Sequence, residues 1–261
     1  MTIRRLAGVL VVLSASLSLP ACLHLPAVVP NPSSTIKEVA VLPVVNNTND
    51  VDAPAAVREW LASEIEGHFY DVQSVKKTDR LLKEQASLTL GSQLNLIEPK
   101  KLCELLKVSG LLYGSLEEFT HKVTGVYNVG RVRVRAKLVE CQTGQTVWKN
   151  GIGVKRILYA GTIGALASIG SMASDKGAGD ELPPLLGDPI AAPWVELKAE
   201  DAGGLVQGVV RGVGEKLVSK ATGGELEGEV INAVRIMYNG YMIKGFSTEP
   251  YGTMIPSGPG A

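Results

Sequence analysis

The sequence predicts an α/β fold in which a mixed β-sheet packs against helices, followed by a C-terminal helical extension. A short valine-rich run at 38–44 is typical of a buried strand. Apolar residues then recur at helical spacing over 53–66, and charged and apolar residues alternate over 130–140 as in a strand. The order of strand, helix, strand, helices and a meander therefore predicts one α/β domain with a mixed sheet.

The first helix is expected at about 53–66. Pro54 fits the first turn of a helix, and Asp52 can cap its N-terminus. The apolar positions that follow form one stripe: Val57, Trp60, Leu61 and Ile65. The elements expected next are a strand at 69–72, a short helix at 79–85, an irregular stretch at 87–97, a helix from Pro99 and a strand at 110–116.

A row of cations marks the next predicted strand. Alternation places the apolar side chains of 130–140 on one face and four cations on the other, namely Arg131, Arg133, Arg135 and Lys137. A turn at 142–145 then leads into a strand at 146–149, which predicts an antiparallel hairpin. Like charges on one face repel, so the row suggests a counter-surface of carboxylates, lipid phosphate or polyanionic sugar. We favour the alternative, a solvated face whose long stems cover their neighbours.

The N-terminal residues 1–21 have the order of a secretory signal peptide. Arg4 and Arg5 precede an apolar run at 6–13, and small residues follow. The apolar run is well short of the ~20 residues that a transmembrane helix needs. We therefore expect export and removal of this segment.

The boundary Leu19-Pro20-Ala21-Cys22 resembles the lipobox of bacterial lipoproteins. In that class the cysteine is lipidated and becomes the first residue after cleavage, so the resemblance implies a lipid on Cys22. Several acyl chains hold a soluble domain stably on a bilayer. Residue 23 is leucine, not the aspartate that resembles an inner-membrane retention signal, so outer-membrane sorting is expected.

The rest of the chain divides by composition. Residues 22–35 carry the lipid site and a Pro-rich tether, and 36–156 form the α/β domain. Residues 157–200 combine a small-residue stretch, for which we favour intersubunit packing, with a Pro-rich loop. C-terminal helices are expected at 201–245 and a tail at 246–261. Three glycines recur every fourth residue on the first of these helices and could let another backbone approach, or could mark a loosely formed helix: Gly204, Gly208 and Gly212.

Several function classes are disfavoured. Removing residues 1–21 leaves 24 basic and 26 acidic residues, which is no footprint for nucleic acid. The three histidines have no metal-ligand spacing, so no metal or other cofactor is expected. Nucleophile elbows, P-loops and dinucleotide turns are absent. Glu117 and Glu118 should point to opposite faces of a strand as part of a solvated surface. We therefore expect no enzyme.

Cys103 and Cys141 are expected as two unrelated thiols rather than a disulfide.

Several segments together resemble a family of periplasmic lipoproteins catalogued as a domain of unknown function, related to the TolB amino-terminal fold and to the curli-secretion lipoprotein. The matching segments are 39–44 with its asparagines, 99–102, 112–113, 136–139 through Thr143-Gly144 to Val147-Trp148, and 250–252. The resemblance implies fold and location more strongly than activity. It suggests an accessory role beside a curli-secretion-like lipoprotein.

Two functions follow as hypotheses. The first is a non-enzymatic adaptor in a cell-envelope assembly or secretion complex, anchored in the outer membrane with its domain facing the periplasm. It would self-associate as a homo-oligomer or bind another envelope lipoprotein. The second is a periplasmic module that binds a small or polyanionic ligand through the basic row.

Overall fold

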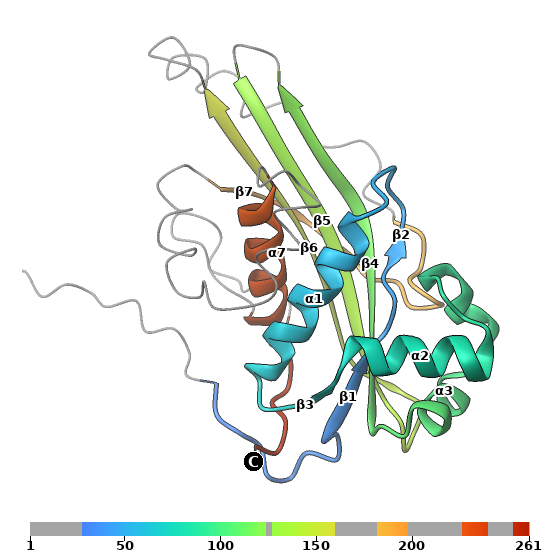
Figure 1. Cartoon of the computed structure of the whole chain (residues 1–261). Helices are drawn as coiled ribbons and strands as arrows, with labels where there is room; N and C mark the ends of the chain where they lie inside the picture. Colours follow the sequence, from blue (N-terminus) through green and yellow to red (C-terminus); the bar gives the residue numbers. More distant parts are fainter. Residues whose placement is uncertain (1–27, 124–126, 160–181, 198–225, 240–252, 261) are drawn as a thin grey trace, which may run out of the picture.

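A computed structural model of the chain describes residues 28–123, 127–159, 182–197, 226–239 and 253–260. Within these residues seven strands form one mixed sheet in the order β3-β1-β4-β5-β6-β7, and β2 pairs with β4. The predicted α/β class with a mixed sheet is confirmed. Figure 1 shows α1 and α7 across one face of the sheet, and α2 and α3 at the lower right, near β1.

The first half of the sheet is parallel. β1 (Glu38–Val41) pairs with β3 (Asp71–Gln73) on one side and with β4 (Gly110–Val123) on the other, and both pairs are parallel. The short β2 (Val45–Asn46) continues the line of β1 along β4. Parallel neighbours need crossover connections, and the helices between these strands provide them.

The second half is an antiparallel meander whose strands are longer than predicted. β4 pairs with β5 (Tyr127–Glu140), and β5 pairs with β6 (Thr146–Tyr159). The prediction ended the first of these strands at 116 and the last at 149. Both strands continue because β5 pairs with each of them along nearly its whole length. Local sequence does not reveal this pairing.

One face of the sheet packs against two helices. α1 (Ala53–Glu66) has the predicted bounds, and α7 (Glu227–Asn239) packs beside it over β5 and β6. Tyr238 of α7 is fully buried and donates from its hydroxyl to the Leu61 carbonyl of α1 over 3.2 Å. This face holds the larger apolar core, to which the sheet contributes Leu112, Val134, Leu138 and Ile152.

The other face carries the remaining helices near the β1 end. α2 (Val75–Ala86) starts earlier than predicted, because Ser74 caps it by accepting from the Lys77 amide. The expected irregular stretch contains a 3₁₀ helix, η1 (Gly91–Leu96), and α3 (Pro99–Leu106) begins at Pro99 as predicted. A second core cluster lies between these helices and the sheet, formed by Leu82, Leu102, Leu106, Leu111 and others.

Cys103 and Cys141 form a disulfide, so the expectation of two unrelated thiols is wrong. The Cα atoms are 5.7 Å apart, although the residues are separated by 38 positions in sequence. The cause is the register of β4 with β5. Ser109, which follows α3, accepts through its carbonyl from the Cys141 amide over 2.9 Å. This contact brings the end of β5 beside the helix that carries Cys103.

The folded unit includes residues beyond the predicted domain end at 156. β7 (Trp194–Leu197) adds to the edge of β6 in parallel, and α7 supplies core residues. The described residues of the expected tail also pack, since Ile255 is buried and donates its amide to the Tyr238 carbonyl. Segments that read as appendages in the sequence therefore complete the sheet and its core.

Candidate functional site

The predicted basic row lies on the sheet face opposite to α1 and α7, and most of it is buried. Arg133, Arg135 and Lys137 are 6%, 1% and 6% exposed, whereas the side chain of Arg131 is 34% exposed. The expectation of a solvated face is therefore wrong for three of the four cations. The cover is the chain itself, because residues 182–197, which we call the strap, cross the row and end in β7.

Main-chain carbonyls of the strap solvate the buried cations. Each cation donates to a different carbonyl oxygen: Arg133 Nε to Ala192 (2.7 Å), Arg135 Nη1 to Pro183 (2.7 Å) and Lys137 Nζ to Leu186 (3.0 Å). Hydrogen bonds to charged groups are stronger than those between neutral groups. The row thus binds the Pro-rich part of the strap, which precedes β7.

Glu117 supplies the buried counter-charge for Arg135. Arg135 Nε donates to Glu117 Oε1 over 2.8 Å, and a second contact comes from Nη2. The hydroxyl of Ser115 donates to the same oxygen over 2.6 Å. The expectation that Glu117 is solvated is wrong, because the register of β4 with β5 shifts between Leu116 and Glu118. Such a bulge inserts one extra residue and re-aims its side chain.

Asp188 of the strap supplies the second counter-charge. Its carboxylate lies 2.7 Å from Lys137 Nζ and accepts from the Thr146 hydroxyl over 2.9 Å. Partial burial raises the pKa of Asp188, but the hydrogen bonds and the charges of Lys137 and Lys149 outweigh this effect, and the net pKa is below the usual value. Asp188 therefore stays ionised and holds the strap to β5 and β6.

Two glycines of β6 make room for the strap. A Cβ on Gly151 would lie 2.6 Å from the Ala191 carbonyl oxygen, and a Cβ on Gly153 would lie 2.5 Å from the Trp194 ring. The Trp194 ring also stacks with the Arg133 guanidinium, whose central carbon is 5.2 Å from the ring centroid. These glycines, which fit no nucleotide-binding motif, serve close packing.

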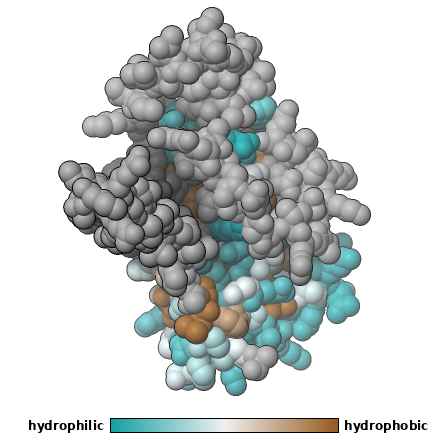
Figure 2. Space-filling model, turned by 90° about the vertical axis from the view of Figure 1, so that its left-hand side faces the viewer, coloured by the Kyte–Doolittle hydropathy of each residue, from teal (hydrophilic) through white to brown (hydrophobic). Residues whose placement is uncertain are grey.

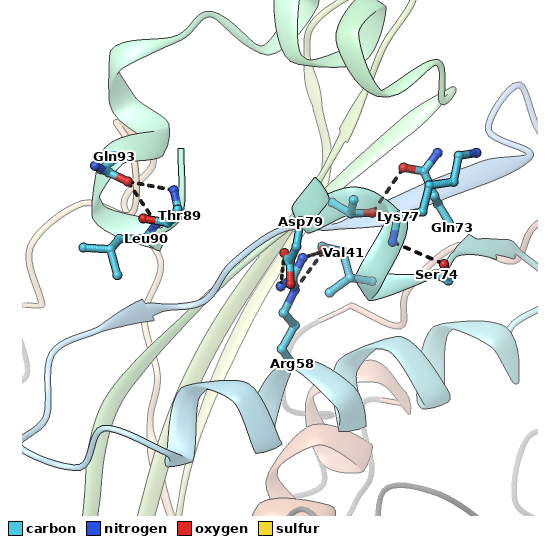
Figure 3. Close-up of polar contacts among 10 residues, drawn as sticks. Val41, Arg58, Gln73, Ser74, Lys77, Asp79, Thr89, Leu90 and Gln93 are labelled. Carbon is cyan, nitrogen blue, oxygen red and sulfur yellow. Dashed lines mark hydrogen bonds and ion pairs between the residues drawn. The ribbon is translucent and has the colours of Figure 1, made fainter. Parts of the chain in front are cut away.

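A further buried arginine, Arg58, was missed by the sequence interpretation. Arg58 of α1 donates from Nε and Nη2 to the Val41 carbonyl at the end of β1, over 3.0 and 2.8 Å, and from Nη1 to Asp79 of α2 over 2.6 Å (Figure 3). Burial lowers the pKa of Arg58, and Asp79 opposes that effect. The apolar stripe of α1 is complete without Arg58, so helical periodicity does not indicate that Arg58 is buried. The sequence shows only a charged residue directly after Val57.

Three segments meet at one end of the domain, which we call the base: residues 28–31, 67–70 and 253–260. The Asn31 amide donates to the Gly258 carbonyl over 2.7 Å, and the Gly258 amide donates to the His68 carbonyl over 2.8 Å. Tyr70 donates from its hydroxyl to the Pro256 carbonyl, and burial raises the pKa of Tyr70 to about 12, so the donor persists at neutral pH. The described part of the tether is thus fixed to the domain.

Phe69 of the base has a left-handed backbone, with φ of 65°. This conformation is unusual for a bulky side chain and is imposed by the surroundings. The Phe69 carbonyl oxygen accepts from the Gly260 amide, and a Cβ on Gly258 would lie only 2.1 Å from that oxygen. Residues 253–260 therefore approach the turn after α1 so closely that glycine is required.

Several predicted site residues lie outside the described residues: Cys22, Gly204, Gly208 and Gly212. Among the residues that the structure describes, no group of three or more histidine, cysteine or acidic side chains could hold a metal ion. Over the same residues, no helix is both long and apolar enough to cross a membrane.

Together, the fold and these contacts define a mixed α/β domain whose buried ion pairs bind its own strap. Residues 31–160 match the family model described as "Putative lipoprotein GNA1162-like". Over these residues the chain belongs to that lipoprotein family, in agreement with the family resemblance seen in the sequence. Acyl chains hold lipoproteins on membranes, so the chain is assigned to the cell envelope.

Three solved structures illustrate the likeness. The lipoprotein GNA1162 from Neisseria meningitidis is 20% identical, with 51% of this chain and 92% of that chain covered and a TM-score of 0.44. The PelC dodecamer from Paraburkholderia phytofirmans is 18% identical, with 54% and 85% covered and a TM-score of 0.33. The LpoB C-terminal domain from Escherichia coli is 17% identical, with 50% and 88% covered and a TM-score of 0.31. Comparison with curated protein sequences found no match.

Proposed function

We propose that this chain is a lipoprotein of the bacterial outer membrane, anchored through Cys22, whose domain faces the periplasm and acts as a non-enzymatic adaptor in a cell-envelope assembly or secretion complex. Its partners would be other envelope lipoproteins, including a curli-secretion-like protein, or further copies of itself. The family membership supports the lipoprotein class, and the particular membrane, complex and partners are the proposal.

The observation that carries the proposal is the position of the family domain relative to the lipobox. The matched region begins at residue 31, nine residues after Cys22. A short tether of this kind suits a domain that works close to its membrane. Leu23, which follows the lipidated residue, favours outer-membrane sorting over inner-membrane retention.

The use of the buried polar groups supports an adaptor rather than an enzyme. Glu117 pairs with Arg135 and Asp188 with Lys137, and strap carbonyls accept hydrogen bonds from Arg133 and Arg135. These groups serve the architecture, and reaching them would require displacing the strap. The same burial argues against the alternative function, a ligand site on the basic row.

Anchoring and sorting are tested by labelling cells with radioactive palmitate and separating the two membranes. We expect the wild-type protein to be labelled and to fractionate with the outer membrane, and Cys22→Ala to lose the label. Leu23→Asp should move the labelled protein to the inner membrane. Leu23→Asn is the matched control, because asparagine has the size of aspartate but no charge. Labelling of Cys22→Ala would contradict the anchor.

The adaptor role is tested by purifying the acylated protein from detergent-solubilised envelopes. We expect a second envelope lipoprotein, or further copies of the chain distinguished by a second tag, to co-purify in a fixed ratio, and much less to do so with Cys22→Ala. A monomer without partners after mild crosslinking in cells would contradict the adaptor function.

A further inference from the structure

The base carries exposed apolar side chains that its own fold does not use. Val29, Phe69 and Met254 are 69%, 37% and 40% exposed, and they come from the three segments that the base hydrogen bonds join. Figure 2, which views the left-hand side of Figure 1, shows an apolar patch on the lower part of the molecule. Single exposed apolar residues are ordinary, but a contiguous group marks an interaction surface.

Phe69 indicates that this surface is of use outside the chain. Phe69 lies three residues after the end of α1, and a left-handed backbone favours glycine or asparagine, which adopt it at little cost. Here an aromatic residue takes the position, and its ring remains partly in solvent. The domain therefore buries the Phe69 ring only in part, and contact with a second phase would bury the rest.

The length of the tether identifies that second phase. Seven peptide units separate Cys22 from Val29, which span at most ~25 Å when fully extended. The Asn31 amide is bonded to Gly258, so the chain cannot lengthen its reach without breaking the base. A lipid on Cys22 consequently keeps the base, and not the opposite end of the domain, beside the bilayer.

We infer that the base is a membrane-docking surface, in which Val29, Phe69 and Met254 contact the boundary between lipid headgroups and acyl chains. This inference rests on the proposed lipid anchor. The exposed charges close to the base segments in sequence have both signs: Glu66 precedes the 67–70 segment, and Asp71 follows it and is bonded through its amide to the Lys37 carbonyl. The contact is therefore apolar and suits zwitterionic lipid. An apolar contact of this kind adds to the hold of the acyl chains and orients the domain, with α1 directed away from the bilayer.

A matched set of exposed apolar residues lies elsewhere. Val51, Leu90 and Leu96 are 85%, 59% and 75% exposed. Val51 precedes the first residue of α1, whereas Phe69 follows its last, and the 14-residue helix separates them by ~21 Å. Leu90 directly precedes η1 and Leu96 is its last residue, and η1 packs on β2. Docking through the base leaves this second set in water.

The test places one tryptophan at each end of the domain in the acylated full-length protein. Phe69→Trp and, as the matched control, Leu90→Trp are reconstituted into zwitterionic phosphatidylcholine vesicles that contain phosphatidylcholine brominated near the headgroup end of the acyl chains. The wild-type protein, with its three tryptophans, provides the reference fluorescence. We expect at least twofold quenching of the additional Phe69→Trp emission and none for Leu90→Trp. Met254→Trp is a second probe that does not depend on the left-handed position.

Flotation of the vesicles separates the two proposals. If the protein floats and both base probes stay unquenched, or are quenched no more than Leu90→Trp, the docking surface is refuted while the anchor stands. In that case the patch faces water or a protein partner. If the acylated protein does not float, the anchor fails and the docking inference fails with it.

Discussion

Arg135 of β5 and Glu117 of β4 form an ion pair whose side chains are 1% and 4% exposed. The pair lies beneath the strap, and the remaining arginine donors reach the carbonyls of Pro183 and Ile190. An ion pair buried to this degree is costly to form but far more costly to break, since removal of one partner leaves an uncompensated charge.

The first prediction concerns this pair. Glu117→Gln or Arg135→Met alone should lower the free energy of unfolding by about 3–5 kcal/mol, and Glu117→Leu combined with Arg135→Met should cost less than either single change. Urea unfolding of the purified protein measures all of these values. The control is Arg131→Gln, because Arg131 and Glu118 are 34% and 31% exposed, and such pairs contribute about 1 kcal/mol or less. Equal losses for Arg131 and Arg135 variants would contradict the structure.

The second prediction concerns the packing of Trp194 on β6. Gly153→Ala would place a Cβ 2.5 Å from the indole ring, and overpacking of this kind costs about 1–3 kcal/mol. We expect faster proteolysis within the strap and a lower unfolding midpoint. Gly228→Ala is the control, since the nearest atom to its Cβ would be 4.0 Å away and alanine favours the helix. A midpoint unchanged by Gly153→Ala would show that Trp194 is not seated there.

The third prediction concerns the disulfide between α3 and the end of β5. Crosslinking residues 38 positions apart stabilises a protein by about 4 kcal/mol in the loop-entropy model. Replacing Cys103 and Cys141 together by alanine, or adding dithiothreitol, should lower the unfolding midpoint by similar amounts. Dithiothreitol should have no effect on the double variant. A free-thiol count of two in the oxidised, exported protein would contradict the bond.

The fourth prediction concerns the pH dependence of the strap. The pKa of Asp188 is lowered in the folded protein from an ordinary value of 3.8, so its contribution to stability is present above about pH 4 and is lost as the pH falls through the lowered value. Between pH 5 and pH 2 the unfolding midpoint should fall less for Asp188→Asn than for the wild type. Parallel curves for Asp188→Asn and the wild type would exclude this linkage.

Local patterns were sufficient for the starts of α1 and α3 and for the core face of the predicted strand at 130–140. Within a helix, proline fits best in the first turn. Pro54 and Pro99 lie in the first turns of α1 and α3, as predicted. The alternation over 130–140 correctly placed Val134 and Leu138 on the core face. The side-chain cap expected from Asp52 does not form, since Asp50 accepts from the Ala53 amide instead. Periodicity indicates which face a residue takes, but not which of two nearby carboxylates caps a helix.

The candidate site was harder to predict, because its counter-charges are distant in the sequence. The basic row is recognisable in the sequence as unusual, and a counter-surface of carboxylates was one explanation for it. Local patterns could not reveal Glu117, whose direction depends on a bulge in β4, or Asp188, which is 51 residues from Lys137. A single alternating strand has two equivalent faces, and nothing local indicates what covers the second one.

The family pattern, the α/β order and the core face of each amphipathic element could be recognised in the sequence alone, which also predicts a lipobox at Cys22. These features depend on covalent order and on residues a few positions apart. Three features became visible only in the folded chain: most of the basic row is buried, Cys103 meets Cys141, and residues 28–31 meet 253–260 at the base. Each of these depends on strand register and on distant segments closing over the sheet, where burial changes a row of surface charges into internal ion pairs.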